Sequence, residues 1–198
     1  MLAAFNRFNK INRAVFASWM RIMAAVPDSI LWLPGGEDEA AANLRREAKS
    51  SGIDPERLTI AARLSSYEDH LARLSLADLF LDTAPYNAHA SASDALWAGV
   101  PVVTMCGESF AGRVAASLLS AVGLEELAVA DIPAYEALVL DLVRDPARRT
   151  ALARRLAENR RTMPLFDMSR RVRDLERAYL HMYRQGANPA AFALRDEA

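Results

Sequence analysis

The alternation of short apolar runs with helical segments is the feature that most limits how this chain can fold. Five runs are expected to be strands: 29–33, 57–64, 78–83, 100–105 and 127–131. The segments between them place apolar residues at helical spacing, and after the last run only helical patterns follow. Short strands that alternate with helices favour a parallel sheet covered on both faces. The sequence therefore predicts an α/β fold, a Rossmann-like, doubly wound, mostly parallel sheet with extra C-terminal helices.

Glycine, proline and capping residues mark where the helices should begin and end. Helices are expected over 13–25, 37–51, 66–76, 109–122, 133–144, 146–161 and 168–185, with one more between Asn87 and Gly99. Ser65 and Glu68 have the spacing of a capping box at one of these starts. Residues 1–186 are expected to form one domain. The Ala-rich tail 187–198 has no clear period and receives no structural prediction.

Composition and charge exclude several classes of partner. The chain has 198 residues, enough for one domain, and a formal net charge of −1,. That charge gives no basis for binding nucleic acid or an acidic membrane surface. No apolar run reaches the roughly 18 residues of a membrane span. We therefore expect neither nucleic acid nor a membrane among its partners.

The chain has a single cysteine, Cys106, in the stretch "MCGES". One cysteine allows no intrachain disulfide and no cysteine cluster for a metal. This usage agrees with a reducing compartment, so we expect a cytoplasmic protein. Cys106 itself follows a strand and is expected to be a small buried residue, in preference to a nucleophile.

Polar residues gather where the predicted strands end. In a doubly wound sheet, ligands bind outside the carboxyl ends of the strands. The residues at these ends are His70, Arg73, Asp82, Thr83, His89, Ser91, Asp94, Gly107, Glu108 and Ser109. A histidine or arginine on a helix is ordinarily a solvated surface residue, and so is a lysine such as Lys10 near a terminus. Their common position makes this edge of the sheet the candidate binding site.

The stretch "NAHASASDALWAGVPVV" (87–103) places small residues at a helix start. Helix N-termini have unpaired N–H groups and a partial positive charge, and small residues let a phosphate approach them. Asp94, one turn later, suits a sugar hydroxyl. The alternative has equal weight: Ser91 or Ser93 caps the helix and the alanines pack. The chain has neither a Walker lysine loop nor a G-x-G-x-x-G stretch that would decide between them.

Three segments resemble a known enzyme family. They are "FNRFNKI", "ADLFLDTAPYNAHASASDALWAGVPVVTMCGESFAGRVAASLL" and "MPLFDMSRRVRDLERAYLHMY", which together extend from about residue 5 to 185. They are similar to the C-terminal catalytic lobe of protein O-GlcNAc transferases, glycosyltransferase family 41, which includes SPINDLY-like enzymes. The resemblance implies the GT-B architecture, in which two Rossmann-like lobes hold UDP-GlcNAc in the cleft between them.

The resemblance implies roles for residues around the diphosphate. Lys10 would neutralise the leaving UDP in place of a metal, so neither a metal nor a cofactor is expected beyond the UDP-sugar donor itself. His89, Ala90 and Ser91 stand where the family has His-Thr-Thr and places the diphosphate on a helix start. Arg7 replaces a glutamine that often contacts the nucleotide. The expected catalytic residue is therefore Lys10, with the others binding the donor.

The resemblance also implies contacts to the nucleoside. Asp94 corresponds to the acid that binds the ribose, and His70 and Arg73 to residues near the uracil and ribose. Tyr67 replaces a lysine that animal enzymes have near the ribose. These departures bear on which sugar is carried more than on whether a nucleotide diphosphate is bound.

The family's other catalytic lobe and its tetratricopeptide repeats have no counterpart in this sequence. We therefore expect a UDP-sugar-binding lobe, with UDP-GlcNAc as donor, from an enzyme that transfers the sugar with inversion to Ser or Thr of proteins. The missing N-terminal lobe would be a partner, the protein acceptor would bind through missing regions, and this chain alone would be inactive. One alternative is a non-catalytic interaction module whose cleft face, the side that the missing lobe would cover, forms a homodimer or binds another protein. The other is a family member that uses another sugar, such as glucose or fucose, or modifies asparagine.

Overall fold

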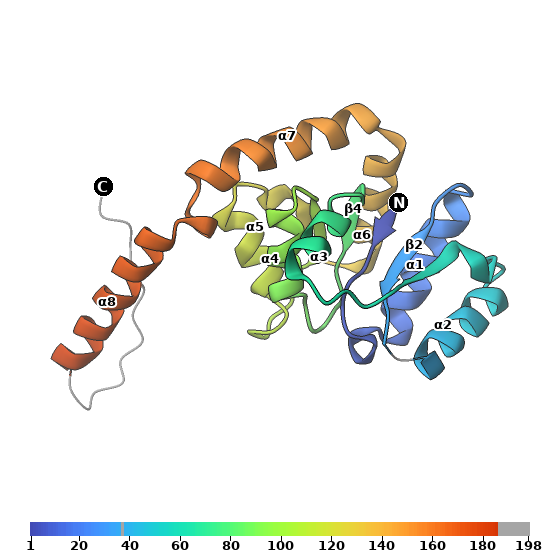
Figure 1. The fold of residues 1–198 in the computed structure, drawn as a ribbon, viewed down its shortest axis with the longest axis horizontal. Helices are drawn as coiled ribbons and strands as arrows, with labels where there is room; N and C mark the ends of the chain where they lie inside the picture. The colour runs from blue at the N-terminus through green and yellow to red at the C-terminus, as the bar shows by residue number, and fades with distance from the viewer. Residues whose placement is uncertain (37, 186–198) are drawn as a thin grey trace.

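A computed structural model describes residues 1–36 and 38–185 of the chain (Figure 1). Six strands form one sheet in the order β3-β2-β1-β4-β5-β6, and every neighbouring pair is parallel. The strands are β1 (Leu2–Ala3), β2 (Leu31–Pro34), β3 (Leu58–Ala61), β4 (Leu79–Leu81), β5 (Val102–Met105) and β6 (Ala128–Val129). This order is that of a doubly wound Rossmann sheet, so the predicted fold class is confirmed.

Strand β1 was not predicted from the sequence, although it lies in the middle of the sheet. Leu2 pairs with Leu31 of β2 on one side and with Leu79 of β4 on the other. Leu2 and Ala3 are almost completely buried. A strand of two residues is too short to show any periodicity, and for this reason its pattern could not be read.

The central strands are buried on both faces. Every residue of β4 and of β5 is buried, as expected of inner strands in a parallel sheet covered by helices,. Trp19, Tyr135 and Phe80 are the largest side chains that are fully buried. These strands fix the loops that follow their carboxyl ends, including the loop after β4.

Eight α-helices accompany the sheet in the described residues. They are α1 (Arg13–Ala25), α2 (Asp38–Ser50), α3 (Tyr67–Leu74), α4 (Ala90–Trp97), α5 (Val114–Ala121), α6 (Ile132–Arg144), α7 (Pro146–Thr162) and α8 (Met168–Gln185). From the centre of the sheet, β1 to β3 follow one another toward one edge and β4 to β6 toward the other. Because crossovers between parallel strands are right-handed, α1 and α2 cover one face of the sheet and α4 and α5 cover the other. Helix α6 returns to pack against α1.

Two helix starts differ from the prediction. The cap of α3 is Ser66, whose side chain accepts a hydrogen bond from the N–H of Asp69, so the predicted box at Ser65 is displaced by one residue. Helix α5 begins at Val114, whereas the prediction began it near 109. The intervening loop folds back on itself at Gly112, where a Cβ would lie 2.9 Å from the Pro85 carbonyl oxygen. Residue 37, at the expected start of α2, lies outside the described residues.

Two side chains at the ends of apolar segments are exposed: Trp97, and Cys106, for which the prediction of a buried residue was wrong. Trp97 is the last residue of α4, and 47% of its surface is accessible. Its ring meets Phe166 edge-on at 5.0 Å instead of entering the sheet interface. Cys106 is also exposed, because it follows the last residue of β5 and faces the loop outside the sheet.

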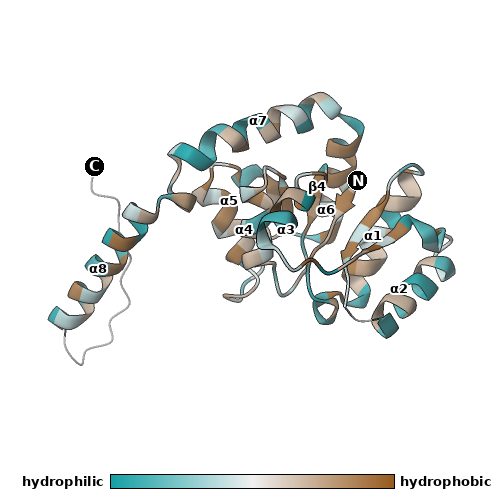
Figure 2. Cartoon of the chain, viewed as in Figure 1, coloured by the Kyte–Doolittle hydropathy of each residue, from teal (hydrophilic) through white to brown (hydrophobic). Residues whose placement is uncertain are grey.

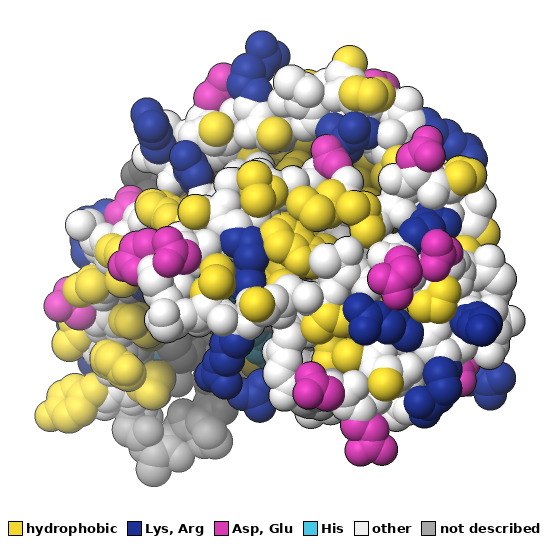
Figure 3. Space-filling view, turned by 45° about the vertical axis from the view of Figure 1, so that its right-hand side comes forward, with side chains coloured by type: hydrophobic (Ala, Val, Ile, Leu, Met, Phe, Trp, Pro, Cys, Tyr) yellow, Lys and Arg dark blue, Asp and Glu magenta, His cyan; other side chains and the backbone are white. Residues whose placement is uncertain are grey.

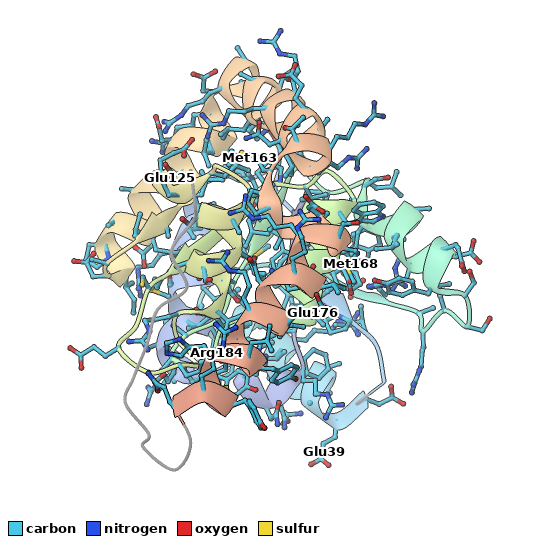
Figure 4. The ribbon with its side chains drawn as sticks, turned by 90° about the vertical axis from the view of Figure 1, so that its left-hand side faces the viewer. Glu39, Glu125, Met163, Met168, Glu176 and Arg184 are labelled. Carbon is cyan, nitrogen blue, oxygen red and sulfur yellow. The ribbon has the colours of Figure 1, made fainter. Side chains whose placement is uncertain are left out.

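The last two helices differ in how they relate to the sheet. Helix α7 runs along one side of the body, whereas α8 projects away from it (Figure 1). Hydrophobic and hydrophilic residues alternate along α8 (Figure 2), and none of its described residues is buried. Met168, Glu176 and Arg184 mark its course in Figure 4. The tail predicted for 187–198 lies outside the described residues.

Within the described part of the chain, no helix has the length and apolar character needed to cross a bilayer. Basic and acidic side chains are interspersed with hydrophobic ones on the face shown in Figure 3.

Candidate functional site at the centre of the sheet

A large pocket lies where the chain reverses its direction across the sheet. From β1 the chain proceeds outward to β2 and β3, and it then returns to place β4 on the other side of β1. Loops that leave two such strands diverge and open a crevice, which is where doubly wound proteins bind ligands. The pocket here has a volume of about 810 Å³ and is lined by Phe5, Asn6, Arg7, Asn9, Lys10, Asn12, Pro85, Tyr86, His89, Ala90, Ser91 and Asp94.

Lys10 joins the two walls of this pocket. It ends the short helix η1 (Phe8–Lys10) in the loop after β1. Its Nζ donates a 2.8 Å hydrogen bond to the carbonyl oxygen of Asn87, in the loop after β4. The same ammonium lies 4.0 Å from the centre of the Tyr86 ring. An ammonium has three N–H donors, so these contacts leave donor capacity for a ligand in the pocket.

The electrostatic surroundings of Lys10 suit an anion. Partial burial lowers the pKa of Lys10 from its usual value, the nearby charge of Asp82 raises it, and the charge of Arg7 lowers it. Two positive groups therefore face one pocket, and an anion bound between them would relieve their mutual repulsion. Arg7 is exposed at the pocket wall.

Helix α4 begins at the pocket without a side-chain cap. Its N-cap residue is His89, and no side chain of the described residues accepts a hydrogen bond from the first N–H groups of α4. The Oγ of Ser91 instead donates to Oδ1 of Asn6 at 3.2 Å. The interpretation of Ser91 or Ser93 as the cap is therefore wrong. Ala90 is exposed, so its small side chain leaves the start of the helix accessible from the pocket.

His89 lies in an aromatic cluster beside the helix start. Its ring stacks on Tyr86, with centroids 5.0 Å apart and an interplanar angle of 18°. Phe110 meets the same ring edge-on at 6.2 Å. The His89 Nε2 lies 3.4 Å from the Ala111 carbonyl oxygen. These contacts fix the imidazole plane and bring the loop after β5 to the edge of the site.

Asp94 forms the far end of the pocket and is bonded to α3. The hydroxyl of Tyr67 donates to its Oδ1 at 2.5 Å, and this bond raises the pKa of Tyr67. Its second oxygen, Oδ2, is not used by this bond. Tyr67 thus holds the Asp94 carboxylate through a hydrogen bond.

His70 and Arg73 do not line the pocket but lie against its wall. His70 packs near Phe5 with ring centroids 5.8 Å apart, and the Arg73 guanidinium lies 5.0 Å from the same ring. Arg73 Nη2 and His70 Nδ1 are 2.9 Å apart. Burial first, and the charge of Arg73 second, lower the pKa of His70, which favours the neutral imidazole. The roles assigned to the eight site residues stay predictions.

Several residues of the pocket were absent from the sequence-based set. The most informative is Asn6, which is 2% exposed and has a buried Nδ2 without a hydrogen-bond partner. Tyr86 was also missed, although it contacts both Lys10 and His89. Recognition of β1 would have identified the segment after it, "FNRFNKIN", as a strand-end loop rich in asparagine. No group of three or more His, Cys, Asp or Glu side chains in residues 1–36 and 38–185 is arranged to hold a metal ion.

Comparisons with known proteins place this site in a family. The family model "Glycosyl transferase family 41" matches residues 1–175. A probable UDP-N-acetylglucosamine–peptide N-acetylglucosaminyltransferase of Arabidopsis thaliana, SEC, is 35% identical over 184 residues, which is 92% of this chain and 19% of the relative. The corresponding Caenorhabditis elegans transferase is 34% identical over 172 residues, 87% of this chain and 15% of its own length.

Solved structures agree with this similarity. A variant of the Thermobaculum terrenum O-GlcNAc transferase superposes with a TM-score of 0.88 at 33% identity, over 93% of this chain and 36% of that one. The pneumococcal O-GlcNAc transferase GtfA, in complex with UDP and GlcNAc, shares the fold at 14% identity, with a TM-score of 0.56 over 91% of this chain and 36% of that one. The fold is that of one Rossmann-like lobe of a GT-B glycosyltransferase. The chain spans less than a fifth of the length of each of the two curated relatives, and it belongs to glycosyltransferase family 41.

Proposed function

We propose that this chain binds the donor, a UDP-sugar such as UDP-GlcNAc, for an O-GlcNAc transferase-like glycosyltransferase. The observation that carries the proposal is the pocket between the loops after β1 and β4, where Lys10 and the uncapped start of α4 face the same space. Relatives named as UDP-N-acetylglucosamine–peptide transferases support the choice of donor.

Each wall of the pocket has a chemical role in this proposal. The diphosphate accepts hydrogen bonds from the N–H groups at Ala90 and Ser91 and interacts with the charges of Lys10 and Arg7. As the bond from the anomeric carbon to the phosphate oxygen breaks, negative charge grows on the departing UDP, and the fixed positive groups stabilise it without a metal. His89 adds a polar contact at the same edge.

The nucleoside would lie along the other end of the pocket. The free oxygen Oδ2 of Asp94 can accept a hydrogen bond from a ribose hydroxyl while Tyr67 occupies Oδ1. His70 and Arg73 lie behind Phe5, close to where the base would follow the ribose. The neutral imidazole of His70 and the charged guanidinium of Arg73 supply polar groups that can form hydrogen bonds with the edge of a pyrimidine.

Transfer itself requires an acceptor hydroxyl in line with the anomeric carbon and a site that excludes water. The pocket described here supplies donor contacts on one side. We propose inverting transfer to Ser or Thr of proteins for the assembled enzyme and expect no turnover by this chain alone. A related donor sugar or acceptor is an outcome that the same assays would identify.

Calorimetric titration of UDP, UMP and UDP-GlcNAc into the chain tests the donor proposal. Lys10→Ala should weaken UDP binding about 10- to 100-fold, since a charge-assisted hydrogen bond contributes about 1.5–3 kcal/mol. The effect on UMP should be smaller, because UMP lacks the second phosphate. The chain has only one other lysine, Lys49 on α2, so Lys49→Ala is a matched control. Absence of UDP binding at millimolar concentration would refute the proposal.

A second function, self-association, is favoured by α8. Five exposed apolar residues alternate at intervals of four and three along this helix: Met168, Val172, Leu175, Tyr179 and Met182. Such spacing is that of a coiled-coil seam. We infer that two copies can pair through α8, a different surface from the cleft face. Sedimentation at several concentrations tests this: Leu175→Glu should shift the chain to monomer, and an unchanged sedimentation coefficient would contradict the pairing.

A further inference from the structure

Asp82 is a buried carboxylate directly beneath the turn that forms one wall of the pocket. It follows the last residue of β4 and is fully buried. Its Oδ1 accepts hydrogen bonds from the N–H of Thr83 at 2.7 Å and of Ala88 at 2.6 Å. Its Oδ2 accepts one from the Thr104 hydroxyl of β5 at 2.6 Å. One side chain thereby closes the turn from 83 to 88 and ties it to the neighbouring strand.

The turn above Asp82 carries two parts of the candidate site. The Asn87 carbonyl oxygen is the acceptor for Lys10, and Ala88 stands two residues before α4 begins. The Asn87 side chain also spans the turn, since its Nδ2 donates to the carbonyl oxygens of Thr83 and Met105. A shift of this turn would therefore move the partner of Lys10 and the start of α4 together.

The main chain of Asp82 is held in place by the two largest side chains of the core, Tyr135 and Trp19. The Tyr135 hydroxyl donates to the main-chain oxygen of Asp82 at 3.2 Å, and Trp19 Nε1 lies 3.3 Å from that hydroxyl. This chain of contacts joins α1, α6 and the end of β4. The position of the turn is therefore set by the core of the domain.

Hydrogen bonding alone does not require a carboxylate at this position. An asparagine would offer one oxygen to Thr83 and Ala88 and an amide to Thr104, whose hydroxyl can accept. The aspartate adds negative charge, and the charged group with which it interacts is Lys10 of η1, whose ammonium is bonded to the Asn87 carbonyl oxygen in the same turn. Burial raises the pKa of Asp82 to about 7. The hydrogen bonds from Thr104, Ala88 and Thr83 and the charge of Lys10 act in the opposite direction and lower it. The remaining titratable neighbour, Tyr135 of α6, is a neutral phenol whose pKa burial raises further.

We propose that Asp82 is a positioning residue for this site, which acts through Lys10 and through the start of α4. Its hydrogen bonds hold the 83–88 turn, and its negative charge is the counter-charge of the Lys10 ammonium. The consequence for UDP rests on the proposed function, whereas the coupling to Lys10 does not.

The coupling to Lys10 can be measured without any ligand. Reductive methylation with ¹³C labels the chain's two lysines and its terminal amine, so few signals arise, and Lys10→Arg assigns that of Lys10. Asp82→Asn should lower the pKa of Lys10 by about 0.5 or more, because the neighbouring negative charge is lost. Lys49 should titrate identically in both proteins. An unchanged Lys10 titration would overturn the counter-charge role.

The holding of the turn is tested by comparing two substitutions at one position. Asp82→Ala removes all three side-chain hydrogen bonds and should weaken UDP binding at least tenfold, whereas Asp82→Asn retains most of the geometry and should recover most of that loss. Asp145→Asn, at the start of α7, controls for a change of one charge on the surface. Equal UDP affinity of Asp82→Ala and the unaltered protein would overturn the positioning role.

Folding of each variant is checked by its thermal transition. If Asp82→Ala does not fold, the Asn variant decides: affinity within threefold of the unaltered protein at pH 8 agrees with a turn held by hydrogen bonds, and a loss above tenfold contradicts it. If the unaltered protein binds no UDP, the proposed function fails, and the Lys10 titration still tests the electrostatic coupling to Asp82.

Discussion

The starts of α4 and α6 show two ways to begin a helix in the same domain. Helix α6 is capped by its own residue, because Asp131 accepts a hydrogen bond from the N–H of Ala134. Helix α4 has no side-chain cap, and the turn before it is held from below by Asp82. Asn12, Ser66 and Asp145 cap α1, α3 and α7 in the manner of α6. Helix α5 also lacks a cap, but its described residues do not line the pocket.

The difference separates stability from binding. A cap satisfies N–H groups at the helix start and so stabilises the helix, but it also occupies the groups that an anion would use. At α4 the turn is fixed by a buried carboxylate that does not line the pocket, and the first N–H groups have no side-chain partner among the described residues. The following predictions change the capped helix start of α6 or the uncapped start of α4, or the contacts that hold them.

The largest effect is expected from Ala90→Asp, which places a carboxylate at the start of α4. Two negative charges about 5 Å apart near a protein surface repel by about 3 kcal/mol, so UDP affinity should fall about 100-fold. Thermal stability should stay equal or rise, because an acidic residue suits a helix N-terminus. Titration calorimetry and a melting curve measure both. Ala90→Asn matches the size without the charge, and a comparable loss in that variant would contradict the electrostatic explanation.

A second prediction concerns pH. The pKa of Asp82 is raised in the folded protein, from 3.8 to about 7, so the folded state binds more protons than the unfolded state between these values. Stability due to this group is therefore fully present below about pH 4 and decreases as pH rises to 7. Between pH 5 and 7 the loss is about 2–3 kcal/mol. Urea unfolding at several pH values should show this loss in the unaltered protein and not in Asp82→Asn. Parallel plots of unfolding free energy against pH for the two proteins would contradict the prediction.

At α6 the expected effect is on stability alone. Asp131→Ala should lower the free energy of unfolding by about 1 kcal/mol, the usual contribution of an N-cap. UDP affinity should not change, since α6 does not contribute to the pocket. Asp131→Asn retains the cap and should be close to neutral. A loss of UDP affinity in the alanine variant would show that the two kinds of helix start are not independent.

The smallest effect is expected from Ser91→Ala. This substitution leaves the N–H groups of α4 in place and removes one hydroxyl, so UDP affinity should fall only about two- to fivefold, or roughly 0.5–1 kcal/mol. A loss as large as that of Lys10→Ala would mean that the hydroxyl, and not the backbone, is the main donor.

The sequence was sufficient for the class of fold and for the edge of the sheet at which the pocket lies, whereas the roles of the site residues stay predictions. Long periodic segments such as α1 and α8 were located to the residue, and the polar strand ends indicated the binding edge. Features that depend on tertiary contacts could not be predicted from the sequence. Trp97 turns outward to meet Phe166, and the Ser91 hydroxyl bonds to a residue 85 positions away. Neither contact has a local signal.

The site residues illustrate the same limit. The resemblance to family 41 identified Lys10 and Asp94, and both lie in one pocket. It did not reveal that Tyr67 would bond Asp94, since that contact depends on how α3 packs beside α4. The role of Asp82 was also hidden: an aspartate that ends a strand looks the same in sequence whether its carboxylate faces solvent or the core.

The place of β1 at the centre of the sheet has a consequence for how the molecule assembles. Leu2 pairs with Leu79, so the first strand of the chain acquires its second neighbour only when residues some 77 positions later have folded beside it. Pairings of high sequence separation form slowly, because the intervening loop must close first. Both walls of the pocket depend on this one pairing. The pocket is therefore expected to form late in folding, after the β2–β3 half of the sheet has formed, and to be lost early when the chain unfolds.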